Sequence, residues 1–306
     1  MERVYRNFYR SFFNRTGGFI PTQPFNQNMY PGDFFQIING EIMVMGNIFR
    51  KGLIRDSDVS FGNGINTGSG SWVFSDGMTK PYTGRILGRD SAGTDAEFCK
   101  QVLAFEEKGS FFFKANNPES VKILNWVELQ QELIIKMTQS LYSFRELYIV
   151  TESAAASDWA LVVSGSAGAE LEIATDAGNF GWVDVFGHAG SKTMQSKDIE
   201  FYHREEKRKP SFYKAKKLVV QDEKMNVFIS DLISQKESHH QWAGGFFEYQ
   251  FQNDPGYLSP GILRSRAGIL DMLQANELNP NTAVLYFKWD DAGLADIEKL
   301  FLTHGY

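Results

Sequence analysis

The stretch that decides the fold is FRELYIVTESAAASDWALVVSGSAGAELEIAT, residues 144–175. Its last part, Ala169–Ala174, alternates strictly between apolar and acidic residues, so the apolar side chains share one face and the two carboxylates share the other. This alternation predicts a half-buried β-strand. Runs of strand-forming residues at Phe144–Thr151 and Trp159–Ser164 precede it, on either side of a break rich in Ser and Ala.

The same kind of pattern continues as far as Val220. Further strands are predicted at Phe180–Phe186, Asp198–Arg204 and Ser211–Val220, with Gly and Pro between them. Residues 145–220 are therefore predicted to form an antiparallel meander with one water-tolerant face.

Two interpretations of this meander remain open. One is an ordinary sheet with a solvated side. The other is a set of hairpins that can exchange water for lipid, since a membrane-crossing strand needs about 9–11 alternating residues and the strands must close into a ring. In that case Glu170 and Glu172 would face an aqueous lumen.

Length and composition restrict the class of protein. The chain has 306 residues, 42% of them hydrophobic and 22% charged, which is typical of a soluble globular protein with one large or two modest domains. A net charge of −6 gives no indication of nucleic-acid binding. Cys99 is the single cysteine, which indicates a reducing compartment. The N-terminus lacks the pattern of a secretory signal, and no 18 consecutive residues are apolar, so we expect a cytoplasmic protein.

The first thirteen residues, MERVYRNFYRSFF, predict a short amphipathic helix that ends at Gly17-Gly18. Aromatic residues lie on one sector and arginines on another, which is typical of a helix that binds a membrane interface. The alternative is a helix docked on the protein body with its arginines in water. The candidate membrane-contact residues are Arg3, Arg6, Phe8, Arg10 and Phe12.

A second basic segment follows the meander strand that ends at Arg204. Clustered cations favour anionic surfaces, and each one near a headgroup layer contributes about 1 kcal/mol. The alternative is the solvated end of a hairpin. The candidate lipid-contact residues of this segment are Lys207, Arg208, Lys209, Lys214, Lys216 and Lys217.

Two regions before the meander carry the other local signals. Asn39-Gly40 between apolar runs predicts a hairpin of the strands Phe34–Ile38 and Glu41–Met45. The Gly-rich region Arg55–Thr94 is predicted to be a mobile loop with one or two short strands. It lacks the Lys-Ser/Thr of a phosphate-binding loop, so no nucleotide site is expected.

The remaining elements are predicted from periodicity and caps. A helix should begin at Asn117-Pro118-Glu119, continue to Tyr142 and lie across a sheet. The other predictions are a helix at Glu97–Lys108, strands at Ser110–Lys114, Met225–Ile233, Trp242–Gln252 and Thr282–Trp289, and helices at Pro260–Leu278 and Asp291–His304. The predicted fold class is α+β: a twisted, mostly antiparallel sheet with an N-terminal amphipathic helix and a long packed helix.

Sequence patterns of catalysis are missing. No histidine stands in a metal-binding HExxH pattern, no Cys pair exists, and no Gly-x-Ser-x-Gly turn occurs. Asp290-Asp291 fits a cap between a strand and a helix better than an acid pair. We expect no enzyme, no catalytic residue, no cofactor and no metal site.

The order of these parts resembles the bacterial gasdermins, a family of pore-forming immune proteins. The resemblance rests on the basic helix Met1–Phe13, a strand pair led by a Pro-Gly turn (PGDFFQIINGEIMVMGNIF), a Gly/Ser-rich middle, a long helix, paired hairpins and a closing basic strand (SFYKAKKLVV). It implies a pore-forming domain at residues 1–222 and a C-terminal extension at 223–306, either inhibitory or part of the same fold. Unlike many members, the chain has no Cys before Cys99, and about 80 residues follow Val220.

The resemblance also implies a mechanism. A partner protease would remove the C-terminal segment, the basic surfaces would gather monomers on an anionic membrane, and the hairpins would oligomerise into a β-barrel pore. The protein would then be cytoplasmic when inactive, membrane-associated when active, and would serve antiviral defence through cell death. Candidate cleavage positions in polar, turn-rich breaks are Ser234, Lys236, Asn253 and Tyr257. The alternative is a soluble α+β interaction or ligand-binding protein, or an assembly subunit, without membrane activity.

Overall fold

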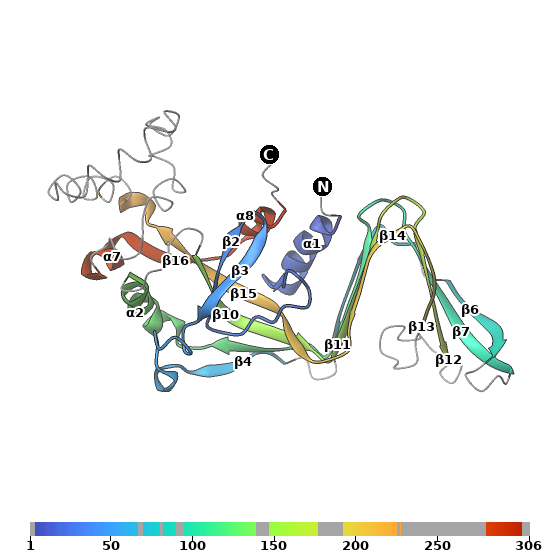
Figure 1. Ribbon diagram of the computed structural model, residues 1–306, viewed down its shortest axis with the longest axis horizontal. Coiled ribbons are helices and arrows are strands. Elements are labelled where there is room, and N and C mark those ends of the chain that lie inside the picture. The colour runs from blue at the N-terminus through green and yellow to red at the C-terminus, as the bar shows by residue number, and fades with distance from the viewer. Residues whose placement is uncertain are drawn as a thin grey trace, which may run out of the picture.

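The structure is a computed structural model that describes residues 4–66, 70–79, 82–89, 95–138, 147–176, 192–224, 227 and 280–301. Its fold is α+β, with antiparallel sheets and an N-terminal helix, as predicted (Figure 1). The helices are α1 (Arg6–Thr16), α2 (Trp126–Thr138), α7 (Pro280–Tyr286) and α8 (Leu294–Lys299), with 3-10 turns at Asp56–Asp58 and Asp222–Lys224. The strands are β1 (Ile20–Pro21), β2 (Asp33–Ile38), β3 (Glu41–Asn47), β4 (Phe61–Asn66), β5 (Ser71–Asp76), β6 (Tyr82–Arg89), β7 (Asp95–Ala104), β8 (Phe111–Asn116), β9 (Glu119–Ile123), β10 (Leu147–Ala156), β11 (Asp158–Ser164), β12 (Glu170–Asp176), β13 (Lys192–Lys197), β14 (Ile199–Glu205), β15 (Lys209–Val220) and β16 (Phe287–Asp291).

The main sheet is built around the long antiparallel pair β10 and β15. Its strand order is β1-β15-β10-β2-β3, and β16 pairs with β15, β9 with β10, and β4 with β9. β10 pairs with three strands. One edge pairs with β15, and the other edge is shared, since β2 pairs with the first residues of β10 and β9 with its last residues. A register shift after Val150 marks a bulge in the pair β10/β15.

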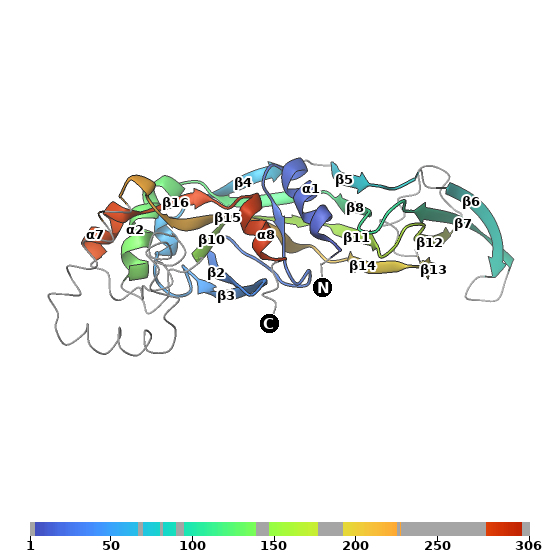
Figure 2. The ribbon, with the colours of Figure 1, turned by 90° about the horizontal axis from the view of Figure 1, so that it is seen from above.

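An arm of four strands projects from this sheet and is bent into two limbs (Figures 1 and 2). We call the sheet β14-β11-β8-β5 the inner limb and the sheet β13-β12-β7-β6 the outer limb. Both limbs have the same strand order, since β5 continues into β6, β7 into β8, β11 into β12, and β13 into β14. The arm therefore consists of two neighbouring hairpins.

The described residues form three apolar clusters, and strand alternation decides which cluster each arm residue joins. Phe111 and Phe113 of β8 pack with α1 and the main sheet, whereas Phe112 between them faces the outer limb. In β11 likewise, Leu161 lies on the α1 side and Val162 on the other side. A further cluster joins α2, α7 and β16 to the main sheet.

Several local predictions are confirmed. Asn39 and Gly40 have φ values of 53° and 78°, the positive pair that a tight two-residue hairpin needs. The strands predicted at Trp159–Ser164 and Ala169–Ala174 correspond to β11 and β12, and that at Ser211–Val220 lies within β15. The strands predicted at Phe180–Phe186, Met225–Ile233 and Trp242–Gln252 and the helix at Pro260–Leu278 lie outside the described residues, apart from Val227.

The Gly-rich region contains more strands than predicted, and the segment after it was predicted wrongly. Arg55–Thr94 contains three paired strands, β4, β5 and β6, where a mobile loop with one or two short strands was expected. Glu97–Lys108 contains most of β7 and no helix. β7 is hydrogen-bonded on both sides, to β6 and to β12, and such long-range pairing overrides a weak local helix preference.

The long helix begins later than predicted. Asn117 has φ 46° and turns the chain into β9, which pairs with both β10 and β4, so the predicted start at Asn117-Pro118-Glu119 is a strand entry. The helix α2 starts at Trp126, and Leu124 and Val127, which lie within the predicted helix, are 55% and 75% exposed. Its buried face is formed instead by Trp126, Leu129, Leu133, Ile134 and Met137.

The C-terminal elements are shorter than predicted. The chain is helical up to Tyr286, so the strand expected at Thr282–Trp289 is confined to β16. Asp291 is the last residue of β16, and α8 begins three residues later after Gly293, whose N–H is bonded to the Asp296 carboxylate. The cap role expected of Asp290-Asp291 is therefore filled by Asp296.

The aromatic packing gives a first prediction. Phe113 is fully buried and contacts Phe8 and Phe12 at ring-centroid distances of 5.3 and 5.2 Å, so Phe113→Ala should lower the free energy of unfolding by about 3–5 kcal/mol. Urea denaturation measures the change. Val127→Ala on the exposed face of α2 is the matched control, with an expected effect below about 0.5 kcal/mol. Equal effects of the two substitutions would contradict this packing.

Candidate functional site

The N-terminal helix is docked on the protein body. Gly17 ends α1 in the left-handed conformation with φ 69°, and Gly18 donates a hydrogen bond to the Phe13 carbonyl. Phe8 and Phe12, both candidate membrane-contact residues, are fully buried. Phe12 stacks on Phe212 of β15 at 5.0 Å. In this structure the aromatic face of α1 therefore belongs to the core.

The arginines of α1 face the C-terminal helix. Figures 1 and 2 show α8 beside α1, and Glu298 of α8 accepts ion pairs from both Arg6 and Arg10. Phe301, just after α8, packs against Tyr9 at 5.3 Å. Burial raises the pKa of Glu298, but hydrogen bonds and charge from the two arginines outweigh it and hold that pKa below its usual value. Arg3 lies outside the described residues.

The basic residues around β15 divide into two groups by their partners. Lys216 and Lys217 pair with Asp291 at 2.6 Å and Asp296 at 3.2 Å. The other group pairs with acids that precede β15 in the chain: Arg208 with Glu119 at 2.5 Å, Lys209 with Glu205 at 2.6 Å and Lys214 with Glu152 at 3.4 Å. Lys207 is exposed, and its backbone N–H is bonded to Glu205.

Asp296 is the most connected acid of this region. Its carboxylate accepts hydrogen bonds from the Tyr148 hydroxyl at 2.7 Å and from the Gly293 N–H at 2.9 Å, and it pairs with Lys217 and Lys299. Burial raises the pKa of Asp296, but these donors and cations together lower it below the ordinary aspartate value. A buried carboxylate with these partners fixes α8 to β10 and β15.

The segment that carries these acids also extends the main sheet. We call residues 280–301 the tail segment. Its strand β16 pairs antiparallel with β15 from Lys216↔Asp291 to Val220↔Phe287, and the Trp289 indole donates to the Gln130 carbonyl of α2. The domain boundary predicted at residue 222 stays a prediction. The candidate cleavage positions Ser234, Lys236, Asn253 and Tyr257 lie outside the described residues.

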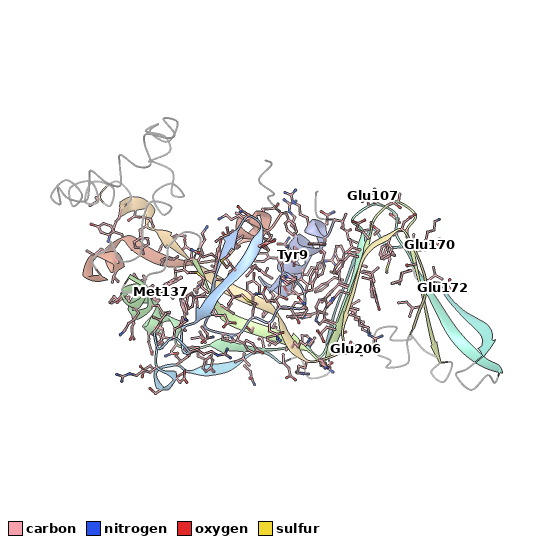
Figure 3. All side chains as sticks on the ribbon, in the orientation of Figure 1. Tyr9, Glu107, Met137, Glu170, Glu172 and Glu206 are labelled. Atoms are coloured by element: carbon pink, nitrogen blue, oxygen red, sulfur yellow. The ribbon has the colours of Figure 1, made fainter. Side chains whose placement is uncertain are left out.

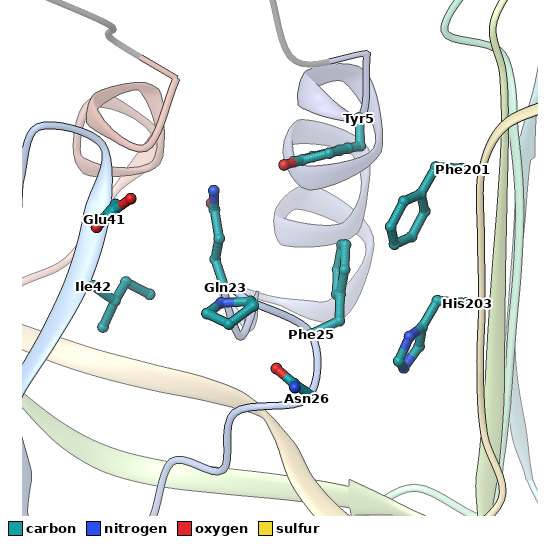
Figure 4. Close-up of a pocket in the computed structure, with 9 residues that line it drawn as sticks. Tyr5, Gln23, Phe25, Asn26, Glu41, Ile42, Phe201 and His203 are labelled. Atoms are coloured by element: carbon teal, nitrogen blue, oxygen red, sulfur yellow. The ribbon is translucent and has the colours of Figure 1, made fainter.

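A pocket with a volume of about 760 Å³ lies between the start of α1, the segment after β1, β3 and β14. Figure 4 shows its lining residues. Aromatic rings of Tyr5, Phe25 and Phe201 form one wall, and Glu41 is the charged residue of the lining. Two polar atoms there are buried without a hydrogen-bond partner, Oε1 of Gln23 and Nε2 of His203. Burial lowers the pKa of His203, so its imidazole is neutral at pH 7. Sequence reasoning missed this pocket because its residues come from four separate elements.

Neither a metal centre nor a helix of transmembrane length is found in the part of the chain that the structure describes. No group of three His, Cys, Asp or Glu side chains there is arranged to hold a metal ion. None of the described helices is long and apolar enough to cross a membrane.

Comparisons with known proteins give a weak similarity of fold. No protein-family model matches the chain, and no curated protein matches it. Among solved structures, the chain is similar to the gasdermin A3 membrane pore determined by cryo-EM, with 12% identity over 72% of this chain and 91% of that chain. The TM-score is 0.24, which is too low to carry a functional conclusion.

The low pKa of Asp296 predicts a pH-dependent attachment of the tail segment. Because the pKa is lower in the folded than in the unfolded chain, the stabilisation is present above about pH 4 and is lost as the pH falls through the folded value. Asp296→Asn should lower the free energy of unfolding by about 1–3 kcal/mol at pH 7, and by less as the pH decreases towards 3. Urea denaturation at several pH values checks this.

Asp290→Asn is the control for that experiment. Asp290 pairs with Lys288, and both side chains are 47% exposed, so the substitution should change the free energy of unfolding by less than about 1 kcal/mol at any pH. If the two variants have the same pH dependence, Asp296 is not the acid that holds the tail segment.

Proposed function

We propose that the chain is a latent membrane-permeabilising protein whose tail segment covers the residues that contact an anionic membrane. The observation that carries the proposal is a charge match. Four cations that the sequence marks as lipid contacts are paired with acids of the tail segment: Arg6 and Arg10 with Glu298, Lys216 with Asp291 and Lys217 with Asp296.

Removing the tail segment would change two properties of the surface. Each uncovered cation gains about 1 kcal/mol of attraction near an anionic headgroup layer, so four cations together would give substantial membrane affinity. Loss of β16 would also leave the N–H and C=O groups of β15 from Lys216 to Val220 without their strand partner. An unpaired edge favours pairing with another chain.

The arm supplies strands that could cross a membrane. Its two hairpins cover residues 71–116 and 158–205, and its outermost strands run in opposite directions. The edge β5/β6 of one copy could therefore pair antiparallel with the edge β14/β13 of the next. A ring of such copies would close into a barrel and remove every free edge, which is the condition for strands in lipid.

The remaining features of the proposal follow from this mechanism. A partner protease would cut between residues 224 and 280, the protein would move from the cytoplasm to an anionic membrane, and copies would assemble there. Neither catalysis nor nucleic acid has a part in the proposed mechanism. Permeabilisation of the cell's own membrane would suit an antiviral defence that ends in cell death.

The pocket of Figure 4 favours a second candidate function, a soluble ligand-binding protein. Its aromatic wall, its single carboxylate and two buried atoms without hydrogen-bond partners would suit a ligand that donates hydrogen bonds. This function needs neither cleavage nor assembly, and the next experiment separates the two candidates.

Dye release from anionic liposomes tests the proposed function. Three proteins are compared: the full chain, a version with an inserted protease site within residues 234–241, and one with the site within 253–260. We expect release only after cutting, and no release from zwitterionic liposomes. Folded proteins that release no dye in any form would favour the soluble function.

Charge variants test whether the cations that the tail segment covers contribute to membrane permeabilisation. In the cut protein, Arg6→Gln with Arg10→Gln should reduce dye release by about thirtyfold, since two cations at about 1 kcal/mol each are removed and about 1.4 kcal/mol corresponds to a factor of ten. Arg50→Gln with Lys51→Gln is the matched control, because it also removes two cations, both exposed, that lie outside the tail segment and are not candidate lipid contacts. Equal losses in the two variants would contradict the role of the tail segment as a cover.

A further inference from the structure

All four strands of the arm contain a left-handed residue at the bend between the limbs. Gly77 follows β5, Gly109 precedes β8, Gly168 precedes β12, and Asp198 separates β13 from β14. Their φ values are 58°, 82°, 72° and 55°, respectively. Strand residues have negative φ, and this region is unfavourable for residues other than Gly, with Asn and Asp tolerated best. The bend is therefore encoded at one position in each strand. We call these four residues the bend line.

The connections at the bend line remain bonded to one another. Gly109 donates to the Ser164 carbonyl, Gly168 to the Phe105 carbonyl and Gly165 to the Asp198 carbonyl, at 2.9 to 3.0 Å. Strand order is consequently the same on both sides of the bend. The limbs are two regular sheets joined by short irregular connections, which is the geometry of a hinge, where a few connecting residues absorb the change in φ and ψ.

An apolar cluster fills the space between the two limbs, on the inner side of the bend. The inner limb contributes Ala160 and Val162, and the outer limb contributes Leu103, Leu171 and Ile173, all at most 3% exposed. The opposite face of the inner limb is already covered by α1. On the outer limb, Glu170 is exposed and Glu172 partly exposed (Figure 3), while Leu171 and Ile173 are buried in this cluster.

We propose that the bend line is a hinge. In water the arm is bent, because bending buries the apolar cluster between the limbs. In a membrane the arm opens, because hydrocarbon replaces the opposite limb as the contact of each limb's apolar face. The inner faces of both limbs would then form one apolar surface for lipid acyl chains. This inference rests on the proposed function for its lipid partner. The hinge itself rests on the four backbone conformations and the cluster.

The length of an aligned arm fits a bilayer. A membrane-crossing strand needs about 9–11 residues. With the inner limb in line, the segment from Asp158 to Asp176 has a length of roughly 60 Å at about 3.3 Å per residue. An opened arm therefore has ample length to cross and to stay attached to the body.

Gly168 is the best position for testing the hinge. A Cβ added there meets nothing within 4 Å, so a substitution acts through φ alone. Gly168→Val should favour the open arm, and Gly168→Asn, which tolerates positive φ, should keep it bent. Gly52→Val is the matched control, because Gly52 also has positive φ and open space around it but lies outside the arm.

The arm angle is measured as the distance between two spin labels. They are placed at Glu172 on the outer limb and Glu206 at the end of the inner limb (Figure 3), as cysteine variants in a Cys99→Ser background. In water we expect one short distance for the full chain, for Gly168→Asn and for Gly52→Val. Gly168→Val should add a second population at longer distance. Without that population in Gly168→Val, the bend line is not a hinge.

The same labels on the cut protein separate the failure of this inference from that of the proposed function. Cut protein that releases dye from anionic liposomes and shows the long distance when bound supports both. Release with the short distance alone overturns the hinge and leaves the proposed function intact. A long distance in Gly168→Val without dye release from any cut form overturns the proposed function and leaves the hinge.

Discussion

The antiparallel pairing of β10 with β15 is the constraint on which the rest of the structure depends. Tyr148–Ala156 of β10 pairs with Lys209–Lys217 of β15, and both strands are connected directly to the arm, β10 to β11 and β15 to β14. The pair also supports the elements at either side, since β10 binds β2 and β9 while β15 binds β1 and β16. The helix α1 and the tail segment are therefore placed by the same two strands that anchor the arm.

This arrangement brings the first and the last described helices together. Aromatic burial fixes α1, since Phe8 and Phe12 lie in the core. Both charge and burial fix α8, since its acids meet cations of α1 and β15 and its Ile297 lies in the same apolar cluster as Phe8 and Phe12. Weakening the ion pairs by salt, acid or substitution would loosen the tail segment, and its release also requires loss of the β16 pairing and of this apolar contact.

The sequence predicts the fold well where one signal is local and strong. Asn39-Gly40 fixes a hairpin, and the alternation of Ala169–Ala174 fixes a half-buried strand. The prediction fails where long-range strand pairing determines the structure, as for β7 and β9, whose residues were expected to form helices.

The basic residues of the candidate site were recognisable in the sequence, but their acidic partners were not. Asp291, Asp296 and Glu298 form no motif. Only the pairing of β16 with β15 brings them to Lys216, Lys217 and α1. The bend line was equally hidden, because its consecutive residues are 30 to 59 positions apart along the chain and only the sheets align them.

The position of β16 has a consequence for the timing of activation. A protease that cuts before residue 280 breaks one peptide bond, but the tail segment is still held by the five residue pairs between β15 and β16 and by several ion pairs. Cutting lowers the effective concentration of the tail segment from that of a tethered partner to that of a free peptide, and release then depends on dilution. A cleaved protein at high concentration would stay inactive for a time, and added tail peptide could inhibit it again. Cleavage would make activation possible, and dissociation of the tail segment would determine its rate.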